Sequence, residues 1–565
     1  MCGIWGLITY GSTAANTDLY HLASETVKPR GPERTTIKQA SNYFLSFHRL
    51  AINGLSTSCD QPYQYEVGND TFIVLCNGEI YNKDELEIQH DIQSPASFEC
   101  DIPSPVYECD TEVIFPVWKA LNFDFIELNK QLKGEYALVI LHLKHNIPFK
   151  IHASVDPCSV RPLFYSIDQV THSFLFSSLL SGIAKMDVQA TRLDGGNCLS
   201  YYFPFGRSNM KSYIDWNPPL PAHMKNDKYS ARSEIVACLK RCIKRRLQSD
   251  RPIGCFLSGG LDSSLVAALV SRELKKRGKR LHTFSIGAAD SEDCKHAEIV
   301  ARHIDSIHTT VPFDSWTAIG YLQEVVKATE TFDLTTIRAS IGQFLVSKYI
   351  AENTDIKVVF SGDGADEEQM GYLYFYLAPN AQEAQEESRK LLQQIHLYDG
   401  LRVDRCVSYH GLEARVPYLD WEFVELYLSF PADWKMPKRG IQPEKHLIRS
   451  AFMQCDPHVL PQCVLMRTKE TFSDSLSTSQ SSWYSLLQST IAREMSSIAL
   501  KTIVESMRGM WKHCPPETDE GAYYRYLFTV LFGNKSATTI PHIWMPKWSK
   551  TRDPSARTLE TYNAK

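Results

Sequence analysis

The sequence lacks a long apolar run, a large net charge and paired cysteines. No stretch approaches the roughly 20 apolar residues of a membrane-spanning helix, and the N-terminus has no basic region followed by an apolar core. A formal net charge of -5 argues against nucleic acid as the main partner. The 15 cysteines are scattered without a Cys-x-x-Cys pair, which favours reduced thiols over disulfides or a zinc site. These absences predict a cytoplasmic protein that binds neither membranes nor nucleic acid.

The sequence also lacks Gly-Lys-Ser and Gly-Lys-Thr, which excludes a Walker phosphate loop. Residues 257–264 instead read Leu-Ser-Gly-Gly-Leu-Asp-Ser-Ser, between an apolar run at 253–257 and helical spacing at 263–276. Glycines let the backbone approach a polyanion, and a helix N-terminus presents free N–H groups, so this order predicts a pyrophosphate-binding turn. Asp262 implies that Mg²⁺ accompanies the phosphates. An ordinary tight turn is the alternative interpretation.

A chain of 565 residues is longer than one hydrophobic core usually organises, so two or more domains are expected. After the helix predicted at 230–248, strands are predicted at 253–257, 281–287 and 357–360, with helices at 295–305 and 317–352 between them. This alternation predicts a parallel sheet with helices on both faces and ligands at the carboxyl ends of its strands. Earlier in the chain, residues 136–141 and 174–176 alternate like strands.

Cys2 becomes the first residue once an initiator methionine is removed. Its α-amine, with a pKa of about 8, can then take the proton of its own thiol, which makes a nucleophile with a built-in base. The alternative is that cysteine stands at position 2 by accident.

Four motifs accompany Cys2, at residues 30–32 (Arg-Gly-Pro), 48–53, 76–82 and 110–112. Together they resemble the class II glutamine amidotransferase domain, an αββα N-terminal-nucleophile fold. The resemblance implies that Cys2 attacks the glutamine carboxamide and that Asn77 and the N–H of Gly78 hold the oxyanion. Taken alone, Asn77-Gly78 is also a hairpin-turn signal.

The same resemblance implies a pocket for a zwitterion. Arg49 would hold the glutamine α-carboxylate, Glu79 and Asp110 would receive the α-ammonium, and backbone groups of the loop would line the pocket. The loop residues are Leu50, Ala51, Ile52 and Asn53. The sequence departs from the family pattern at Pro29 and Glu33, where His and Asp are usual, and carries a polar insertion of about 20 residues between Glu87 and Asp110 that predicts a surface loop.

Further motifs lie at residues 331–340, 361–367, 411–420, 444–449, 544–548 and 553–558. With the Ser-Gly-Gly-x-Asp-Ser turn of the ATP pyrophosphatases, they resemble the glutamine-hydrolysing asparagine synthetase family over almost the whole chain. The resemblance implies ATP binding by Leu257, Ser258, Gly259, Gly260, Asp262, Ser263, Ile286, Ser361, Gly362 and Lys445, with Mg²⁺ at Asp262. It places Thr335, Thr336 and Arg338 near aspartate.

Asp363 stands where most of the family has glutamate in Ser-Gly-x-Gly, a position linked to the β-aspartyl-AMP intermediate. A carboxylate drawn back by about 1 Å can cost up to about 100-fold in rate. The alternative is that Asp363 is a turn-forming residue without a catalytic role. Residues 369–378 also lack the usual Gly-Gly-Tyr and His-Lys.

The resemblance implies a glutaminase domain at 2–205, a linker at 206–228, a synthetase domain with a parallel sheet of the adenine-nucleotide α-hydrolase type at 229–548, and a polar tail at 549–565. Such an enzyme makes asparagine from aspartate, ATP and glutamine, with an internal passage for ammonia and a homodimer as a conceivable assembly. Two alternatives stay open, namely another adenylating amide-forming enzyme of the β-lactam synthetase type and a binding or regulatory protein built on the same scaffold.

Overall fold

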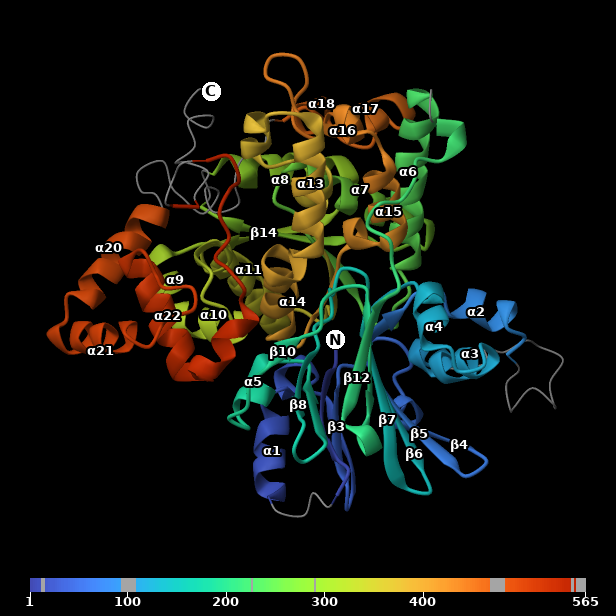
Figure 1. Ribbon diagram of the computed structural model, residues 1–565. Coiled ribbons are helices and arrows are strands. Elements are labelled where there is room, and N and C mark those ends of the chain that lie inside the picture. Colours follow the sequence, from blue (N-terminus) through green and yellow to red (C-terminus); the bar gives the residue numbers. More distant parts are fainter. Residues whose placement is uncertain are drawn as a thin grey trace.

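The computed structural model describes residues 1–11, 16–92, 108–224, 227–288, 291–467, 483–549 and 553–554. Figure 1 shows two parts that lie against each other. The first part, coloured blue to teal, holds most of the strands, and the second, green to red, surrounds one sheet with helices. The predicted two-domain organisation is confirmed.

The first part is built on two six-stranded antiparallel sheets. One sheet has the order β10-β8-β9-β1-β3-β2, with bounds Thr191–Arg192, Phe164–Asp168, Ser173–Ser177, Gly3–Thr9, Tyr43–Arg49 and Arg34–Ala40. The other has the order β12-β11-β7-β6-β5-β4, with bounds Arg207–Ser212, Asn197–Tyr202, Ile147–Val155, Gly134–Lys144, Asp70–Ile80 and Tyr63–Val67.

Alternation along the strands explains how these sheets stack. Ile73 and Leu75 of β5 pack in one apolar layer with side chains of β1 and β3, whereas Val74 and Cys76 pack with helices on the opposite face. The outer helices are α1 (Thr17–Glu25) and α5 (Leu180–Ala184) on one side, and α2 (Lys83–Gln89), α3 (Ile114–Ala120) and α4 (Phe125–Gln131) on the other. The predicted αββα layering is confirmed.

Two details of the prediction are wrong in this part. Residues 207–212, assigned to the linker from the sequence, form β12 and pair with β11, so the first domain continues past residue 205. The prolines at 218, 219 and 221, which mark a break in the sequence pattern, follow this edge strand. The hairpin interpretation of Asn77-Gly78 also fails, because β5 pairs with β6 along its whole length.

The second part contains a five-stranded parallel sheet with the order β15-β14-β13-β16-β17. Its strands are Ile307–Pro312, His282–Gly287, Ile253–Phe256, Val358–Phe360 and Glu413–Arg415. The strands predicted at 253–257, 281–287 and 357–360 are thus confirmed, as is the parallel arrangement.

Helices cover both faces of this sheet, because neighbouring strand residues such as Val358 and Val359 belong to different apolar clusters. One face carries α6 (Lys228–Arg245), α7 (Leu261–Lys276), α8 (Glu292–Ile304), α15 (Trp421–Ser429) and α17 (His446–Cys455). The other carries α10 (Leu322–Thr329), α11 (Leu334–Asn353), α14 (Asp399–Ser408) and α22 (Asp519–Phe532). The remaining helices are α9 (Ser315–Gly320), α12 (Ala365–Glu368), α13 (Ala381–Gln393), α16 (Ala432–Lys435), α18 (Gln462–Leu465), α20 (Trp483–Met495) and α21 (Ile498–Arg508).

Most of the predicted surface loop between Glu87 and Asp110, and most of the tail after Trp548, lie outside the described residues. Among the helices of the described ranges, none has both the length and the apolar character needed to cross a membrane.

Candidate active sites

A cavity of about 200 Å³ opens at the carboxyl ends of β13, β14 and β16. That edge of a parallel sheet is where the strand order predicts a ligand. The cavity brings together the following residues singled out from the sequence: Leu257, Ser258, Gly260, Asp262, Ser263, Ile286, Ser361, Gly362, Asp363 and Lys445. The structure therefore places ten of the predicted site residues around one space.

The Ser-Gly-Gly turn joins β13 to the N-terminus of α7. Gly259 adopts φ +74°, and a Cβ there would lie 2.5 Å from the carbonyl oxygen of Asp293, so only glycine fits without strain. The hydroxyls of Ser258 and Ser263 lie 2.9 Å apart across the turn. Gly260 caps α7 without a side chain, so the first N–H groups of a 16-residue helix point toward the cavity end. The turn has the geometry of an anion site.

Lys445 bridges two carboxylates of the cavity. Its Nζ pairs with Asp262 and lies 2.6 Å from Oδ1 of Asp366, and the lysine side chain is buried. Burial alone would lower the pKa of Lys445, but Asp262 and Asp366 outweigh it and raise the pKa above the ordinary value. Lys445 is also the N-cap of α17 in the left-handed conformation, with φ +57°. A fixed ammonium therefore stands beside the anion-binding turn.

The opposite end of the cavity is an ionic cluster that the sequence reasoning did not find. Oδ1 of Asp363 lies 2.5 Å from a guanidinium nitrogen of Arg402, which also pairs with Asp399. The Tyr372 hydroxyl donates to Glu367 at 2.6 Å and contacts Asp399 at 2.5 Å. This end offers carboxylates and a guanidinium to a zwitterionic ligand.

The pKa values of Glu367 and Asp399 shift in opposite directions. Burial and the neighbouring Asp399 raise the pKa of Glu367 well above its ordinary value. Burial opposes ionisation of Asp399 as well, but Arg402 outweighs it, and the pKa of Asp399 is lowered. The pair therefore holds a proton on Glu367 while Asp399 is charged.

Four predicted residues do not line the cavity. Gly259 lies behind the turn against α8, and Thr335, Thr336 and Arg338 occupy the start of α11. Thr336 donates to Asp333, the N-cap of α11, and Arg338 forms ion pairs with Glu520 and Asp553 at 2.6 and 2.9 Å. Because none of these three residues lines the cavity, their assignment to aspartate binding stays a prediction.

Other lining residues were not singled out from the sequence. The apolar wall adds Phe256, Phe284 and Val346, and the polar rim adds Ser285, Asp293, Cys294, Gln343, Gly364, Asp366, Arg449 and Arg467. Asp366 and Gly364 stand within a quoted motif, and the parallel-sheet rule could have pointed to Ser285 near the end of β14.

One further group could bind a cation among the described residues, namely Cys242, Asp420 and Glu422, whose ligand atoms lie within 4.8 Å of one another. Both carboxylates are already paired with Arg245, and Asp420 also with Arg246. The arginines balance this charge, so the group does not act as a metal site.

In the first part, Cys2 directly precedes β1 and lies beside Asn77 of β5. Its backbone N–H donates to Oδ1 of Asn77 at 2.9 Å, and its Sγ lies 3.7 Å from the carbonyl oxygen of Leu50. Burial raises the pKa of the Cys2 thiol despite the nearby N-terminal ammonium. Cys2, Asn77 and the loop that begins at Leu50 are therefore brought together as predicted.

Gly78 is fixed by a close approach of two strands. It adopts φ +150°, and a Cβ would lie 2.1 Å from the carbonyl oxygen of Glu135 on β6. A side chain at this position would push β5 and β6 apart. Glycine thus allows the N–H of residue 78 to remain beside Asn77 near Cys2.

The loop after β3 wraps around Arg49. The guanidinium donates to the carbonyl oxygens of Gly54 and Ser56 and lies 2.6 Å from Oδ1 of Asp60. Nearby, Asn53 donates to Glu79, and Asp110 accepts the N–H of Ile80. The guanidinium and the carboxyl groups expected for a zwitterion therefore stand on neighbouring segments.

One departure from the family pattern, Glu33, has a local explanation. Glu33 accepts the N–H of Ala51 at 2.9 Å and pairs with Arg251 of the second part at 2.9 Å. Arg251 in turn donates to the carbonyl oxygen of Ala51. The loop 50–53 is thus held from both sides, by its own domain and by the other.

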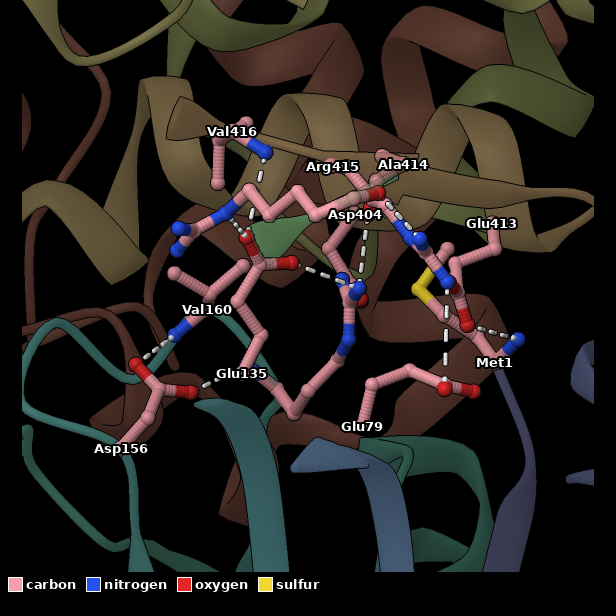
Figure 2. A network of polar contacts seen from close by, with 12 residues as sticks. Met1, Glu79, Glu135, Asp156, Val160, Asp404, Glu413, Ala414, Arg415 and Val416 are labelled. Atoms are coloured by element: carbon pink, nitrogen blue, oxygen red, sulfur yellow. Dashed lines mark hydrogen bonds and ion pairs between the residues drawn. The ribbon is translucent and has the colours of Figure 1, made fainter. Parts of the chain in front are cut away.

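A buried ionic network connects side chains from both parts of the chain (Figure 2). Glu135 of β6 accepts from Arg161 and Arg246, each at 2.8 Å, and from the N–H of Val416. The Met1 ammonium lies 3.1 Å from Glu413 of β17, where burial opposes ionisation but the ammonium and neighbouring arginines lower the pKa of Glu413 to about 2. The network joins the two parts through buried ion pairs and hydrogen bonds.

Comparisons with known proteins cover the whole chain. A family model described as a glutamine amidotransferase domain matches residues 1–216, and one described as asparagine synthase matches residues 234–391 and 378–544. The chain is 36% identical over 593 residues to asparagine synthetase [glutamine-hydrolyzing] of Bos taurus, covering 100% of this chain and 99% of that relative. It is 35% identical over 594 residues to the Homo sapiens protein of that name, with the same shares covered.

Proposed function

The chain belongs to the family of the glutamine-hydrolysing asparagine synthetases, and on that premise we propose how its two sites share the reaction. It is an ATP-dependent carbon–nitrogen ligase that makes L-asparagine from L-aspartate with glutamine as the nitrogen donor. The observation that carries the assignment is full-length similarity together with one site in each domain. Glutamine, aspartate and ATP are its small-molecule substrates.

The cavity of the second domain is the place for adenylation. Phe284, Ile286 and Val346 offer an apolar wall to the adenine ring, and the turn with the N-terminus of α7 faces the phosphates. The aspartate β-carboxylate attacks the α-phosphorus, the bond to the β-phosphate oxygen breaks, and β-aspartyl-AMP and diphosphate result. Lys445 stabilises the negative charge that develops on the phosphate oxygens.

The ionic end of the cavity suits aspartate better than the start of α11 does. Arg402 is positioned to meet a carboxylate, and Asp363 and Asp399 are positioned to meet the α-ammonium. We assign to Asp363 the proton that ammonia loses as it displaces AMP. We then assign an indirect role to Thr335, Thr336 and Arg338, in which they position α11 behind the aspartate site.

The residues of the cavity fit Mg²⁺. Asp262 and Asp366 supply carboxylate oxygens beside the anion-binding turn, which are the donors that this cation prefers alongside phosphate. Asp262 and Asp366 would hold the ion together with phosphate oxygens. When bound, Mg²⁺ supplies positive charge that neutralises the diphosphate as it leaves.

The first domain supplies ammonia. Once Met1 is removed, the Cys2 amine takes the thiol proton, the thiolate attacks the carboxamide carbon, and ammonia leaves as a thioester forms. Asn77, which accepts the Cys2 N–H, and the N–H of Gly78 would bind the oxyanion, and water then releases glutamate. Arg49 and the pair of Glu79 and Asp110 hold the two charged ends of glutamine.

Ammonia then has to pass between the domains without protonation by bulk water. β17 is a suitable wall for such a passage, because it lies at the boundary of the two domains, where its Ala414 accepts from Arg161 of the first domain. A cytoplasmic location agrees with free thiols at all cysteines of the described residues. A homodimer remains a prediction from the family resemblance.

The test measures asparagine and diphosphate made from aspartate and Mg-ATP, with glutamine and ammonia supplied separately. The wild type should use both nitrogen sources. Cys2→Ala should lose at least about 1,000-fold with glutamine and retain the ammonia-dependent rate, because only the nucleophile is removed. Product from neither source would overturn the assignment of the acceptor acid, and equal loss with both sources in Cys2→Ala would overturn the division of labour.

A further inference from the structure

Two cysteines that the proposed mechanism does not use lie at the rim of the glutamine pocket. Cys59 precedes Asp60, the partner of Arg49, and Cys109 precedes Asp110. Cys59 ends a short turn after β3, whereas Cys109 begins the segment that follows the insertion. Two loops distant in sequence thus bring one thiol each to the same place.

Gly54 shows how closely the loops approach. A Cβ on Gly54 would lie 2.6 Å from Sγ of Cys59 and 3.1 Å from the carbonyl oxygen of Glu108, the residue before Cys109. Polar contacts also join the two loops: Sγ of Cys59 lies 3.7 Å from Oε2 of Glu108, while Sγ of Cys109 lies 3.3 Å from Oγ1 of Thr111 within its own segment. Tyr63, for example, donates to the carbonyl oxygen of Cys59 at 3.2 Å and lies 3.3 Å from Oγ1 of Thr111.

The surroundings of Cys59 favour its thiolate. The contact with Cys109 is the largest cause that lowers the pKa of Cys59 to about 7, and the Ser56 and Ser58 hydroxyls at 3.7 and 3.8 Å contribute as well. Burial and the same contact raise the pKa of Cys109, so the pair holds one proton. Near neutral pH a substantial share of Cys59 is therefore nucleophilic.

The pair lies just beneath the surface. Cys59 is 1% and Cys109 7% exposed, but the side chains that cover them, Ser58 and Glu108, are exposed and bonded to each other at 2.9 Å. Neither cysteine belongs to the cluster of possible metal ligands found among the described residues. The exposed side chains of Ser58 and Glu108 both contact Sγ of Cys59, at 3.8 and 3.7 Å, so their displacement would bring an oxidant to that sulfur.

We infer that Cys59 and Cys109 form a reversible disulfide that controls the use of glutamine. The Cys59 thiolate attacks one oxygen of hydrogen peroxide, the O–O bond breaks, and the leaving hydroxide takes a proton to become water. Cys109 then attacks the sulfur of the resulting sulfenic acid, the S–O bond breaks, and a second water forms with the thiol proton. Two thiols are oxidised, one peroxide is reduced, and two waters are released.

The bond changes the pocket through its neighbours in sequence. A disulfide draws the sulfur atoms to about 2.05 Å, closer than any hydrogen-bonded contact, so at least one loop has to move. Movement of Cys59 shifts Asp60 and with it Arg49, and movement of Cys109 shifts Asp110. This consequence rests on the proposed function, in which those side chains hold the charged ends of glutamine.

A displacement near 1 Å at binding groups can cost about 100-fold. We therefore expect oxidation to raise the KM for glutamine by about 10- to 100-fold. The ammonia-dependent rate should not change, because the pair touches nothing in the cavity of the second domain. Dithiothreitol should restore the use of glutamine.

The experiment treats the full chain with hydrogen peroxide and maps disulfides by peptide mass spectrometry, first in Cys2→Ala so that the catalytic thiol cannot contribute. A cross-link between Cys59 and Cys109 is expected. A cross-link from either cysteine to Cys100, or none at all, would overturn the modification site whatever the enzyme does. This readout needs no activity, so its failure is distinct from failure of the proposed function.

Kinetics with an intact Cys2 then test the control of glutamine use. Cys59→Ser and Cys109→Ser should keep the glutamine-dependent rate after peroxide treatment, while the exposed Cys455→Ser serves as a matched control and should lose it like the wild type. Inhibition of Cys59→Ser to the same extent as the wild type would assign the effect to Cys2 and overturn the inference. A cross-linked wild type with an unchanged KM for glutamine would also overturn it.

Discussion

Arg30 of the first domain binds both carboxylate oxygens of Asp404 in the second, at 2.7 and 2.9 Å. Both side chains are buried, and 374 positions separate them in the chain. Asp404 also accepts from Arg405 at 2.7 Å and faces Arg161 at 3.5 Å. One carboxylate therefore balances guanidinium groups of both domains.

Replacement of Asp404 by asparagine should destabilise the protein strongly. The change leaves buried arginines without their counter-charge, a situation that costs about 3 to 5 kcal/mol. Urea denaturation with domain-specific probes should report a lower midpoint for both domains. Asp187→Asn is the matched control, because its ion pair with Lys535 is exposed and should contribute little. Equal midpoints for the two variants would contradict this role of Asp404.

The same carboxylate should make the stability of the protein sensitive to acid. Burial opposes ionisation of Asp404, but Arg30, Arg405 and Arg161 outweigh it, so its pKa in the folded state lies well below that of an unfolded aspartate. A depressed pKa contributes stability that is complete above the unfolded value of about 3.9 and is lost as pH falls toward the folded value.

We therefore expect the free energy of unfolding of the wild type to fall more steeply than that of Asp404→Asn as pH drops below about 4. Urea titrations at a series of pH values measure both slopes. Parallel curves through this pH range would show that Asp404 does not carry the effect.

Gly78→Ala should disable the use of glutamine. The new methyl group would meet the carbonyl oxygen of Glu135 at 2.1 Å, so β5 and β6 have to separate beside Cys2. Loss of a positioned oxyanion donor costs about 100- to 1,000-fold in kcat. Glutamate release reports the loss. Gly68→Ala, in a turn with φ +62° and open space around it, should cost about 1 kcal/mol of stability and leave the glutaminase active. Similar activity of the two variants would contradict the proposed geometry.

Asp363→Glu should raise the rate of asparagine formation from ammonia. Asp363 is held by Arg402 and bonded to Ser361, and one more methylene group would advance the carboxylate into the cavity by about 1 Å. Initial rates of diphosphate release measure the change, with Asp363→Asn as the matched variant expected to lower the rate. An unchanged or lower rate in Asp363→Glu would favour a purely structural role in the turn.

Lys445→Met should abolish synthesis from both nitrogen sources and leave glutamine hydrolysis in place. The change removes the cation between Asp262 and Asp366 and leaves two carboxylates beside incoming phosphates. We expect at least about a 100-fold loss in kcat. Exchange between ATP and labelled diphosphate isolates the adenylation step. Lys276→Met, at the exposed end of α7, is the control and should behave like the wild type. Persistent exchange in Lys445→Met would exclude this role.

The parallel sheet was predictable because its strands are short apolar runs bounded by turn residues, as at β13 and β16. The helix predicted at 317–352 was wrong in extent, since it is three helices. Glu330 ends α10 in the left-handed conformation with φ +54°, and Asp333 caps α11. Apolar residues continue at helical spacing across this break, so periodicity alone could not reveal it.

The residues of the sites were likewise only partly predictable from the sequence. Residues of one local motif line the cavity because a single turn and helix position them, as for Ser258, Asp262 and Ser263. Asp399 and Arg402 reach it from α14, which the sequence gives no reason to place beside Asp363. Their ionic contacts arise only when α14 packs against α11, a tertiary event without a local signal.

The left-handed backbone of Lys445 has a consequence for selection and engineering. A side chain in this conformation costs roughly 1 to 2 kcal/mol, which glycine or asparagine would largely avoid. The ion pairs of Lys445 with Asp262 and Asp366 offset that cost, because loss of the ammonium leaves two carboxylates without their counter-charge. Libraries sorted for heat resistance and for growth without asparagine should therefore both retain lysine at position 445, and a stabilised descendant of this chain has to draw its gain from elsewhere.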